Sequence, residues 1–343
     1  MITDRPDTPD SDDAPEASDN VPTTSDLSAR VEPSDTQSTD TADTAARRCG
    51  FVAIIGAPNA GKSTLVNALV GSKVTIVSRK VQTTRTTIRG IALVGTSQLV
   101  LIDTPGIFAP QRRLDRAMVE AAWGGAADAD VVALMVDAQK GLTDDVQRIV
   151  DTLRPGRCGT VLVLNKTDRL EDKGALLALA GALSEKVKFD EVFMVSAETG
   201  DGLDVLAADF AARVPQGPWH YPEDDISDLP MRLLAAEVMR EKIYDRLHQE
   251  LPYATTVETT DWRDMGKRGV RIEQTIYVER TSQRAIVLGA KGQTMKAMAM
   301  DARREIGEMI ERPVHLFTFV KVRERWSDDP ERYREMGLAF PSD

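Results

Sequence analysis

Five short runs of apolar residues, separated by stretches of helical character, lie between residues 51 and 195 of this 343-residue chain. Strands that are apolar throughout are typical of parallel strands covered by helices on both faces of a sheet. The pattern therefore predicts an α/β, doubly wound domain over residues 47–215. The apolar runs are residues 51–55, 99–102, 131–136, 161–164 and 192–195.

A glycine-rich octapeptide, Gly56 to Ser63, follows the first run and precedes a helical stretch over residues 64–70. It matches the pattern G-x-x-x-x-G-K-[ST], in which backbone N–H groups and the start of a helix face phosphate groups. We expect Lys62 to reach the β and γ phosphates of a nucleotide and Ser63 to coordinate magnesium.

Two later motifs at strand ends predict which nucleotide is bound. Asp-Thr-Pro-Gly begins at Asp103, which is placed to hold the metal through water, and ends at Gly106, whose N–H is placed to contact the γ phosphate. Asn-Lys-Thr-Asp ends at Asp168, whose carboxylate can accept from two N–H groups of guanine. Adenine lacks that donor pair, so GTP is favoured over ATP. After the next run, the N–H of Ala197 is placed to donate to guanine O6.

All of these motifs follow apolar runs, at the edge where an open α/β sheet binds its ligands. The residues that we assign to the nucleotide are Gly56, Ala57, Pro58, Asn59, Ala60, Gly61, Lys62, Ser63, Thr64, Asp103, Thr104, Pro105, Gly106, Asn165, Lys166, Thr167, Asp168, Ser196 and Ala197.

The second half of the chain predicts a smaller α+β domain. Residues 216–230, with three prolines and an acidic patch, are the candidate linker, and residues 231–325 read as helix, two strands, two helices and a strand. Gly289-Ala-Lys-Gly292 lies between the two helices, which is typical of a KH domain of type II. Residues 326–343 form a C-terminal helix and tail.

Charge is distributed unevenly along the chain. The net charge is −11, of which residues 1–46 carry −10. These residues contain no aromatic side chain and no apolar periodicity, so we expect a disordered acidic tail. We interpret this tail as a solubilising appendage or an over-long gene start rather than as a binding segment. Residues 263–304 instead carry a net charge of +6, a plausible footprint for RNA phosphates, although about half of these basic side chains are expected to be ordinary surface charges.

The motifs together resemble the translation-factor-related GTPases, and residues 78–85, 103–107 and 221–237 resemble the bacterial Era family in particular. The resemblance covers about residues 48–338. It implies that Gln-Thr-Thr-Arg, residues 82–85, belongs to switch I and that Thr83 or Thr84 contacts magnesium when GTP is bound. We favour Thr84.

The resemblance also implies GTP hydrolysis, and the predicted metal ligands are Ser63, Thr84 and Asp103. Ile107 replaces the glutamine that orients the attacking water in Ras-like enzymes, so we expect slow intrinsic hydrolysis.

Asn59 is either a ligand for K⁺ or only a turn residue, and equal rates of hydrolysis in potassium and sodium buffers would remove the first alternative. The family commonly has an arginine and a histidine where this chain has Ala57 and Phe108, so we assign neither position a role from the family's side chain. The residues assigned to catalysis are Lys62, Thr84, Asp103, Gly106 and Asn59.

For the second domain the resemblance implies binding to the 3′ region of 16S rRNA, association with the 30S ribosomal subunit and a role in its maturation. A nucleotide-gated RNA-binding scaffold with incidental GTP turnover is the alternative. We expect a monomer that binds no DNA. The unpaired cysteines indicate the cytoplasm, and the resemblance adds peripheral contact with the inner membrane. The predicted RNA-binding residues are Gly289, Ala290, Lys291, Gly292, Lys296 and Arg284.

Overall fold

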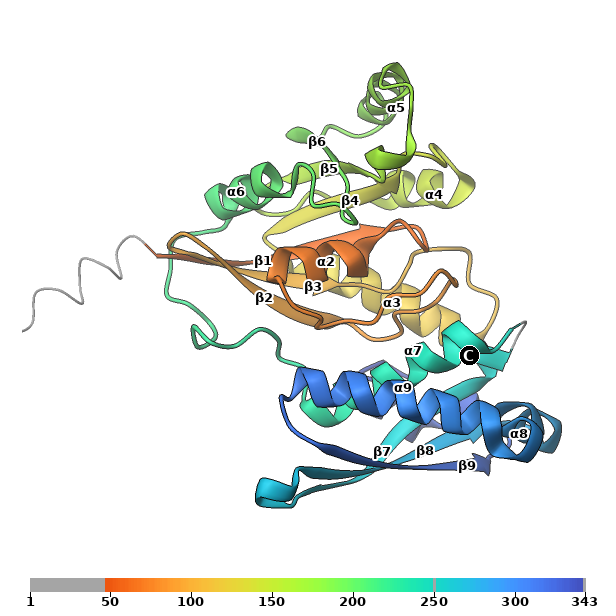
Figure 1. Ribbon diagram of the computed structural model, residues 1–343. Coiled ribbons are helices and arrows are strands. Elements are labelled where there is room, and N and C mark those ends of the chain that lie inside the picture. The colour runs from red at the N-terminus through yellow and green to blue at the C-terminus, as the bar shows by residue number, and fades with distance from the viewer. Residues whose placement is uncertain (1–46, 249–250, 342–343) are drawn as a thin grey trace, which may run out of the picture. The chain divides into compact units, whose positions relative to one another are not determined.

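The computed structural model describes residues 47–248 and 251–341 (Figure 1). The predicted acidic tail, residues 1–46, and the last two residues of the predicted C-terminal tail lie outside the described residues. In the described part, no helix combines the length and the apolar character that a membrane span requires.

A six-stranded sheet organises the first half of the chain, with strand order β2-β3-β1-β4-β5-β6. Five strands are parallel, and they correspond to the five apolar runs. The strands are β1 (Arg48–Gly56), β2 (Ile88–Val94), β3 (Ser97–Asp103), β4 (Val131–Asp137), β5 (Thr160–Asn165) and β6 (Glu191–Val195).

Strand β2 is a correction to the predicted sheet, because the apolar pattern gave no strand between residues 56 and 99. It pairs antiparallel with β3 through a short turn at residues 95–96, so the sheet is mixed. Its second half, residues 91–94, is an apolar run of four residues, as long as the run at 99–102, so the sequence carried this signal and the prediction overlooked it. A Cβ at Gly90 would lie 2.8 Å from Cγ2 of Val70, so the close packing of the neighbouring helix requires glycine there.

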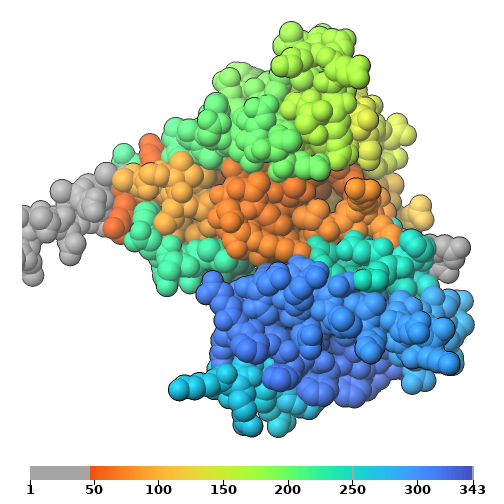
Figure 2. Space-filling view, in the orientation of Figure 1, coloured from red at the N-terminus to blue at the C-terminus, as the bar shows by residue number. Residues whose placement is uncertain are grey.

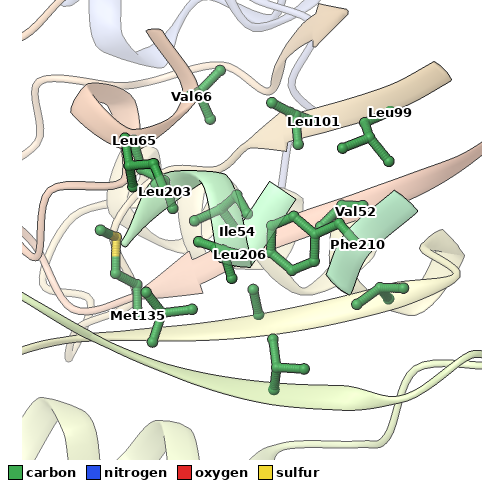
Figure 3. Close-up of a cluster of buried hydrophobic side chains, with 14 of the residues drawn as sticks. Val52, Ile54, Leu65, Val66, Leu99, Leu101, Met135, Leu203, Leu206 and Phe210 are labelled. Atoms are coloured by element: carbon green, nitrogen blue, oxygen red, sulfur yellow. The ribbon is translucent and has the colours of Figure 1, made fainter. Parts of the chain in front are cut away.

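Helices cover both faces of this sheet (Figure 1). Leu65 and Val66 of α2 pack with Leu206 and Phe210 of α6 against one face (Figure 3), and α3, α4 and α5 bury the other face. Both faces of the parallel strands are therefore buried, as the apolar runs predict. The helices are α2 (Lys62–Val70), α3 (Arg113–Asp128), α4 (Asp144–Thr152), α5 (Gly174–Ser184) and α6 (Leu203–Arg213).

The second half contains a three-stranded sheet in the order β7-β8-β9, with β7 antiparallel and β9 parallel to β8. Its element order, helix, two strands, two helices, strand, is the predicted one. Met298 and Ile306 of α9 and Met239 of α7 are buried in its core, so these methionines serve packing. The elements are α7 (Met231–Arg246), β7 (Thr255–Asp264), β8 (Val270–Val278), α8 (Thr281–Leu288), α9 (Gln293–Met309) and β9 (Val314–Val322).

Two irregular segments are held against the first domain. The predicted linker, residues 216–230, follows the antiparallel edge, where Oε1 of Gln98 accepts from the N–H groups of His220 and Tyr221. The C-terminal segment, residues 326–341, packs Trp326 and Tyr333 against α3. The remaining short helices are η1 (Thr167–Arg169), η2 (Leu251–Ala254), η3 (Gly266–Arg268), η4 (Ala290–Gly292), η5 (Trp326–Asp328) and α10 (Pro330–Glu335).

Candidate nucleotide and RNA sites

The glycine-rich loop between β1 and α2 is braced by Asn165. Gly61 has a φ of 105°, and a Cβ at this position would lie 2.2 Å from Nδ2 of Asn165, so glycine is required. The Asn165 side chain donates to the carbonyl of Ala60 (2.8 Å) and accepts from the N–H of Ala197 (3.0 Å). Asn165 thus ties the predicted phosphate loop to the segment predicted to contact the base.

Lys62 is buried at the start of α2, with 6% of its surface exposed. Its ammonium group donates to the carbonyls of Gly56 (3.1 Å) and Ala57 (3.0 Å). Burial lowers the pKa of Lys62 to about 8, against the opposing effect of the Asp103 carboxylate. A buried ammonium group favours a negatively charged ligand, because the nearby negative charge stabilises its protonated form.

The three predicted metal ligands meet below the phosphate loop. The Ser63 hydroxyl donates to Oδ2 of Asp103 (2.7 Å), and Oγ of Ser63 lies 2.9 Å from Oγ1 of Thr84. Thr84 also lies 3.5 Å from the same carboxylate oxygen. Thr83 instead donates to the carbonyl of Lys80 (2.8 Å), so the geometry is consistent with the choice of Thr84.

Asp103 is fully buried, and its Oδ1 has no hydrogen-bond partner among the described residues. Burial raises its pKa, while the hydroxyls of Ser63, Thr75 and Thr84 and the charge of Lys62 act in the opposite direction. An orphaned carboxylate oxygen among hydroxyl groups fits a hard divalent cation such as Mg²⁺, which prefers oxygen ligands.

Thr75 is a residue of this cluster that the motifs did not indicate. It is fully buried, and its hydroxyl donates to Oδ2 of Asp103 at 2.8 Å. Thr75 belongs to no recognised motif, and only the packing of the loop after α2 brings it to Asp103. It therefore orients the carboxylate from outside the predicted ligand set.

The predicted guanine site lies at the ends of β5 and β6. Oδ1 of Asp168 accepts from the Ser196 hydroxyl (2.7 Å), which leaves Oδ2, 3.7 Å from Nε of Arg169, to face a ligand. Lys166 donates to the carbonyl of Asn59 (2.6 Å) and to Oδ2 of Asp137 (2.7 Å). Asp137 was not predicted to belong to the site. It directly follows the apolar run of β4, as Asp103 follows the run of β3, so the same signal could have identified it.

The Asp-Thr-Pro-Gly segment packs against the phosphate loop. Thr104 donates to the carbonyl of Ile54 (2.8 Å), and the N–H of Ile107 donates to the carbonyl of Gly56 (3.1 Å). Ile107 has only 4% of its surface exposed, so its side chain packs in the core. Gly106 is thereby held next to the phosphate loop, as its predicted contact with the γ phosphate requires.

Asn59 adopts a left-handed conformation, with a φ of 62°, and its side-chain amide donates to the carbonyl of Arg79 (3.0 Å). The turn role is therefore present in the structure, and the cation role stays a prediction.

A cavity of about 1010 Å³ opens between the phosphate loop and switch I. The predicted residues Pro58, Asn59, Gly61, Lys62, Ser63, Thr64, Thr84, Gly106 and Lys166 line it. Asp168, Ser196 and Ala197 lie beyond its lining, next to Arg169 and Glu198, which do line it. The other predicted residues, Gly56, Ala57, Ala60, Asp103, Thr104, Pro105, Asn165 and Thr167, do not line it.

Helix α7 of the second domain closes the far side of this cavity. Tyr244, Asp245 and His248 line it, although no sequence motif indicated them. Figure 2 shows the orange surface of the first domain directly against the cyan and blue surface of α7 and α9. The nucleotide cavity is thus built from both domains.

Residues 73–80, which lead into the Gln-Thr-Thr-Arg stretch of switch I, contact α7 through charged and polar groups. Glu241 accepts from the ammonium group of Lys73 (2.6 Å) and from the N–H of Val77 (2.9 Å), and these hydrogen bonds help to lower its pKa against the effect of burial. Lys80 donates to the carbonyls of Tyr244 and Leu247, at the end of α7.

Arg85 makes the deepest of these contacts. It follows Thr84 directly, and its guanidinium group donates to the carbonyls of Thr255 (2.9 Å) and Pro252 (3.1 Å) and to the Tyr244 hydroxyl (3.1 Å). Only 3% of Arg85 is exposed. A residue next to a predicted metal ligand is therefore anchored in the second domain.

The Gly-x-x-Gly loop forms the corner between α8 and α9. Gly289 has a φ of 72°, and a Cβ there would lie 2.1 Å from Oγ1 of Thr294. Ala290, Lys291 and Lys296 are exposed around the corner. Arg284, on α8, donates through Nε to the carbonyl of Val320 (3.1 Å). Five of the six predicted RNA-binding residues therefore lie at this corner or within the next turn of α9, and Arg284 lies further back on α8.

Comparison with known proteins extends this picture. Residues 51–166 match the family model described as 50S ribosome-binding GTPase, and residues 250–327 match the KH domain model. GTPase Era of a Bradyrhizobium strain is 63% identical over 294 residues, covering 86% of this chain and 95% of that protein. GTPase Era of Brucella suis is 60% identical over 295 residues, covering 86% and 94%.

Two solved structures agree with these relatives. A single-residue variant of Aquifex aeolicus Era bound to GDP·AlF4⁻ superposes with a TM-score of 0.80 at 35% identity, covering 85% of this chain and 99% of that chain. A structure of Era in complex with MgGDPNP and nucleotides 1506–1542 of 16S ribosomal RNA gives the same values.

The fold and the site define a P-loop GTPase joined to a KH domain. Within that class, the identity to curated relatives over almost their whole length places the chain in the Era family of GTPases. Its activity is the hydrolysis of GTP.

Proposed function

We propose that this GTPase binds GTP with Mg²⁺ and uses the nucleotide to control the binding of rRNA by its KH domain. The observation that carries the nucleotide part is the cluster of Ser63, Thr84 and Asp103, in which one buried carboxylate oxygen lacks a partner among the described residues. Bound Mg²⁺ would neutralise charge developing on the phosphates. The chain's own contribution is positioning, with Lys62 and the backbone of the phosphate loop holding the triphosphate.

Thr75→Val tests the metal site, because valine has nearly the shape of threonine but lacks the hydroxyl that holds Asp103. We expect the Mg²⁺ concentration for half-maximal GTP hydrolysis to rise about tenfold, the usual cost of losing a group that orients a metal ligand. Steady-state phosphate release across a magnesium titration measures this shift. Thr199→Val serves as control, since Thr199 is exposed and makes no contact with Asp103. An unchanged magnesium requirement would show that Thr75 does not support a metal ligand.

We further propose that the RNA is the 3′ region of 16S rRNA and that the protein acts in maturation of the 30S subunit. The exposed Gly-x-x-Gly corner, with Lys291 and Lys296 beside it, suits single-stranded RNA. The solved Era complex, 35% identical to this chain, contains a 16S rRNA fragment.

Replacing both loop glycines tests the RNA site. Gly289→Asp with Gly292→Asp adds negative charge and side-chain bulk where the sugar-phosphate backbone approaches, so we expect at least about a hundredfold loss of affinity for a 16S 3′-end oligonucleotide. GTP binding should be unchanged. Fluorescence anisotropy measures the RNA affinity, and displacement of a fluorescent GDP analogue measures GTP binding.

The Gly292→Asp single variant keeps this test valid if the double variant folds poorly. Gly292 has a φ of 75°, a left-handed conformation that aspartate tolerates better than most residues, and a Cβ there meets no atom within 4 Å, whereas one at Gly289 clashes with Thr294. Intact RNA affinity in a folded variant would overturn the assignment.

A nucleotide-gated RNA scaffold with incidental turnover stays the alternative. A Thr84 variant that binds GTP without hydrolysing it separates the two, because a scaffold would support ribosome assembly without turnover. Four further expectations stay predictions: that Asn59 binds K⁺, that the protein is a monomer, that it is located in the cytoplasm, and that it makes peripheral contact with the inner membrane.

A further inference from the structure

A second cavity, of about 380 Å³, lies where the two domains and the C-terminal segment meet. One wall is the start of α3 in the GTPase domain, and the opposite wall is the start of α8 in the KH domain. Ser327 and Asp328 of the C-terminal segment close a third side. The cavity is separate from the nucleotide cavity, and only Gln82 lines both.

Two arginines from different domains face this cavity without a carboxylate partner. Arg112 precedes α3, Arg280 precedes α8, and both are exposed. Within residues 47–248 and 251–341, neither guanidinium group forms an ion pair, although many other arginines of this chain do. Two uncommitted guanidinium groups that line one cavity form a binding position for an anion, and arginine matches phosphate geometry well.

The other charged groups of the cavity have partners of their own, although the donors to its two hydrogen-bonded carboxylates are neutral and leave their charges in place. Asp115 accepts from the side chain of Gln82 (3.2 Å) and from the N–H groups of Gln111 and Arg112. Glu279 accepts from the Ser327 hydroxyl (3.2 Å). The Arg113 guanidinium group lies over the Phe340 ring.

Two carboxylates also belong to the surroundings and oppose an anion. Asp328 lines this cavity and also a neighbouring cavity of about 390 Å³, which Glu324 lines as well. Arg280 lines that neighbouring cavity too, together with Arg325, which is exposed. Counted over all charged side chains that line the two cavities, five arginines (Arg85, Arg112, Arg113, Arg280 and Arg325) face four carboxylates (Asp115, Glu279, Glu324 and Asp328).

The position of α8 connects this cavity with the RNA loop. Helix α8 runs from Thr281 to Leu288, directly before Gly289, and Arg280 precedes its first residue. Eight helical residues span about 12 Å, the length of roughly two to four nucleotides. An RNA strand that continues from the Gly-x-x-Gly loop along α8 reaches Arg280 within that distance.

We propose that RNA extending beyond the KH groove places a backbone phosphate between Arg280 and Arg112, so that the RNA contacts the GTPase domain directly. This inference rests on the proposed RNA-binding function. Arg112 directly precedes α3, the helix that follows the Asp-Thr-Pro-Gly segment. An RNA phosphate at this cavity therefore bridges the KH domain and the helix that follows the Asp-Thr-Pro-Gly segment.

The test compares two RNA lengths in the full-length protein. One RNA has about five nucleotides, enough to fill a KH groove, and the others extend the same sequence by about six nucleotides at either end. Arg112→Ala should lower the affinity for one of the two extended RNAs about fivefold, and the slope of log affinity against log salt should fall by about 0.7. The affinity for the short RNA should not change.

Arg116→Ala is the matched control, because Arg116 is exposed one turn further along α3 and does not line the cavity. Asp328→Asn should act in the opposite direction and raise the affinity for the same extended RNA. Thermal melting confirms that each variant is folded.

Three results overturn the inference: unchanged affinity of Arg112→Ala for both extended RNAs, an equal loss for the short RNA, or an equal loss in Arg116→Ala. None of these results removes the proposed function if the Gly292→Asp variant still loses RNA binding. If the wild-type protein binds none of these RNAs, the proposed RNA-binding function itself fails.

Discussion

Asp168→Asn should lower the affinity for GTP at least about a hundredfold and make the protein prefer XTP over GTP. The carboxylate is expected to accept from N1–H and the 2-amino group of guanine, and an asparagine presents N–H donors to that amino group instead. Each buried donor left unpaired costs about 1–3 kcal/mol. Xanthine carries a carbonyl oxygen in place of the amino group, so the same asparagine can donate to it.

The local structure allows this exchange without loss of the fold. Oδ1 of Asp168 accepts from the Ser196 hydroxyl, and the side-chain oxygen of an asparagine can accept the same hydrogen bond. Displacement of a fluorescent GDP analogue by GTP and by XTP measures both affinities. Asp172→Asn is the control, because this carboxylate lies a few residues further along the chain and accepts from the N–H of Gly174. GTP affinity within about threefold of wild type would show that Asp168 does not bind the base.

The parts of the site that the sequence predicted share one physical property. Lys62, Asp103 and Asp168 each belong to a short contiguous motif directly after an apolar strand. Because parallel strands end at the same edge of a sheet, the order of strands alone brings such motifs together. The structure places them at that edge, although their roles in binding stay predictions.

The parts that were missed depend on packing between distant segments. Thr75 reaches Asp103 only because of the path of the loop after α2, and Tyr244 faces the nucleotide cavity only because α7 lies on switch I. Strand β2 is a different case, because its apolar run at residues 91–94 was present in the sequence and was overlooked. Local patterns carry no information about such contacts, which form only when the whole domain packs.

Arg85→Ala should destabilise the protein by about 3–5 kcal/mol and uncouple RNA affinity from the bound nucleotide. The guanidinium group is buried and donates to two carbonyls and the Tyr244 hydroxyl, so its removal leaves buried acceptors without a donor. It also lies over the rings of Tyr244 (5.9 Å) and Trp326 (5.7 Å). At about 2–4 °C for each kcal/mol, the melting temperature should fall by roughly 10 °C.

The coupling follows from the place of Arg85 in the chain. Thr84 approaches Asp103 and Ser63, and the next residue is fixed in the second domain. A movement of switch I that withdraws Thr84 must therefore pull on Tyr244 and on the carbonyls of Pro252 and Thr255, or break their hydrogen bonds. In the Arg85→Ala variant this connection is missing, so the ratio of RNA affinities with a GTP analogue and with GDP should approach one.

A surface arginine separates this effect from a general loss of charge. Arg89 lies four residues away, is 45% exposed and pairs with Asp228 at 2.8 Å. Its replacement by alanine should change stability by less than about 1 kcal/mol and leave the nucleotide dependence of RNA binding unchanged. Tyr244→Phe, which removes only one of Arg85's acceptors, should give an intermediate ratio. A wild-type ratio in a folded Arg85→Ala protein would show that switch I acts on the KH domain through other contacts, of which the ion pair of Lys73 with Glu241 is the next to test.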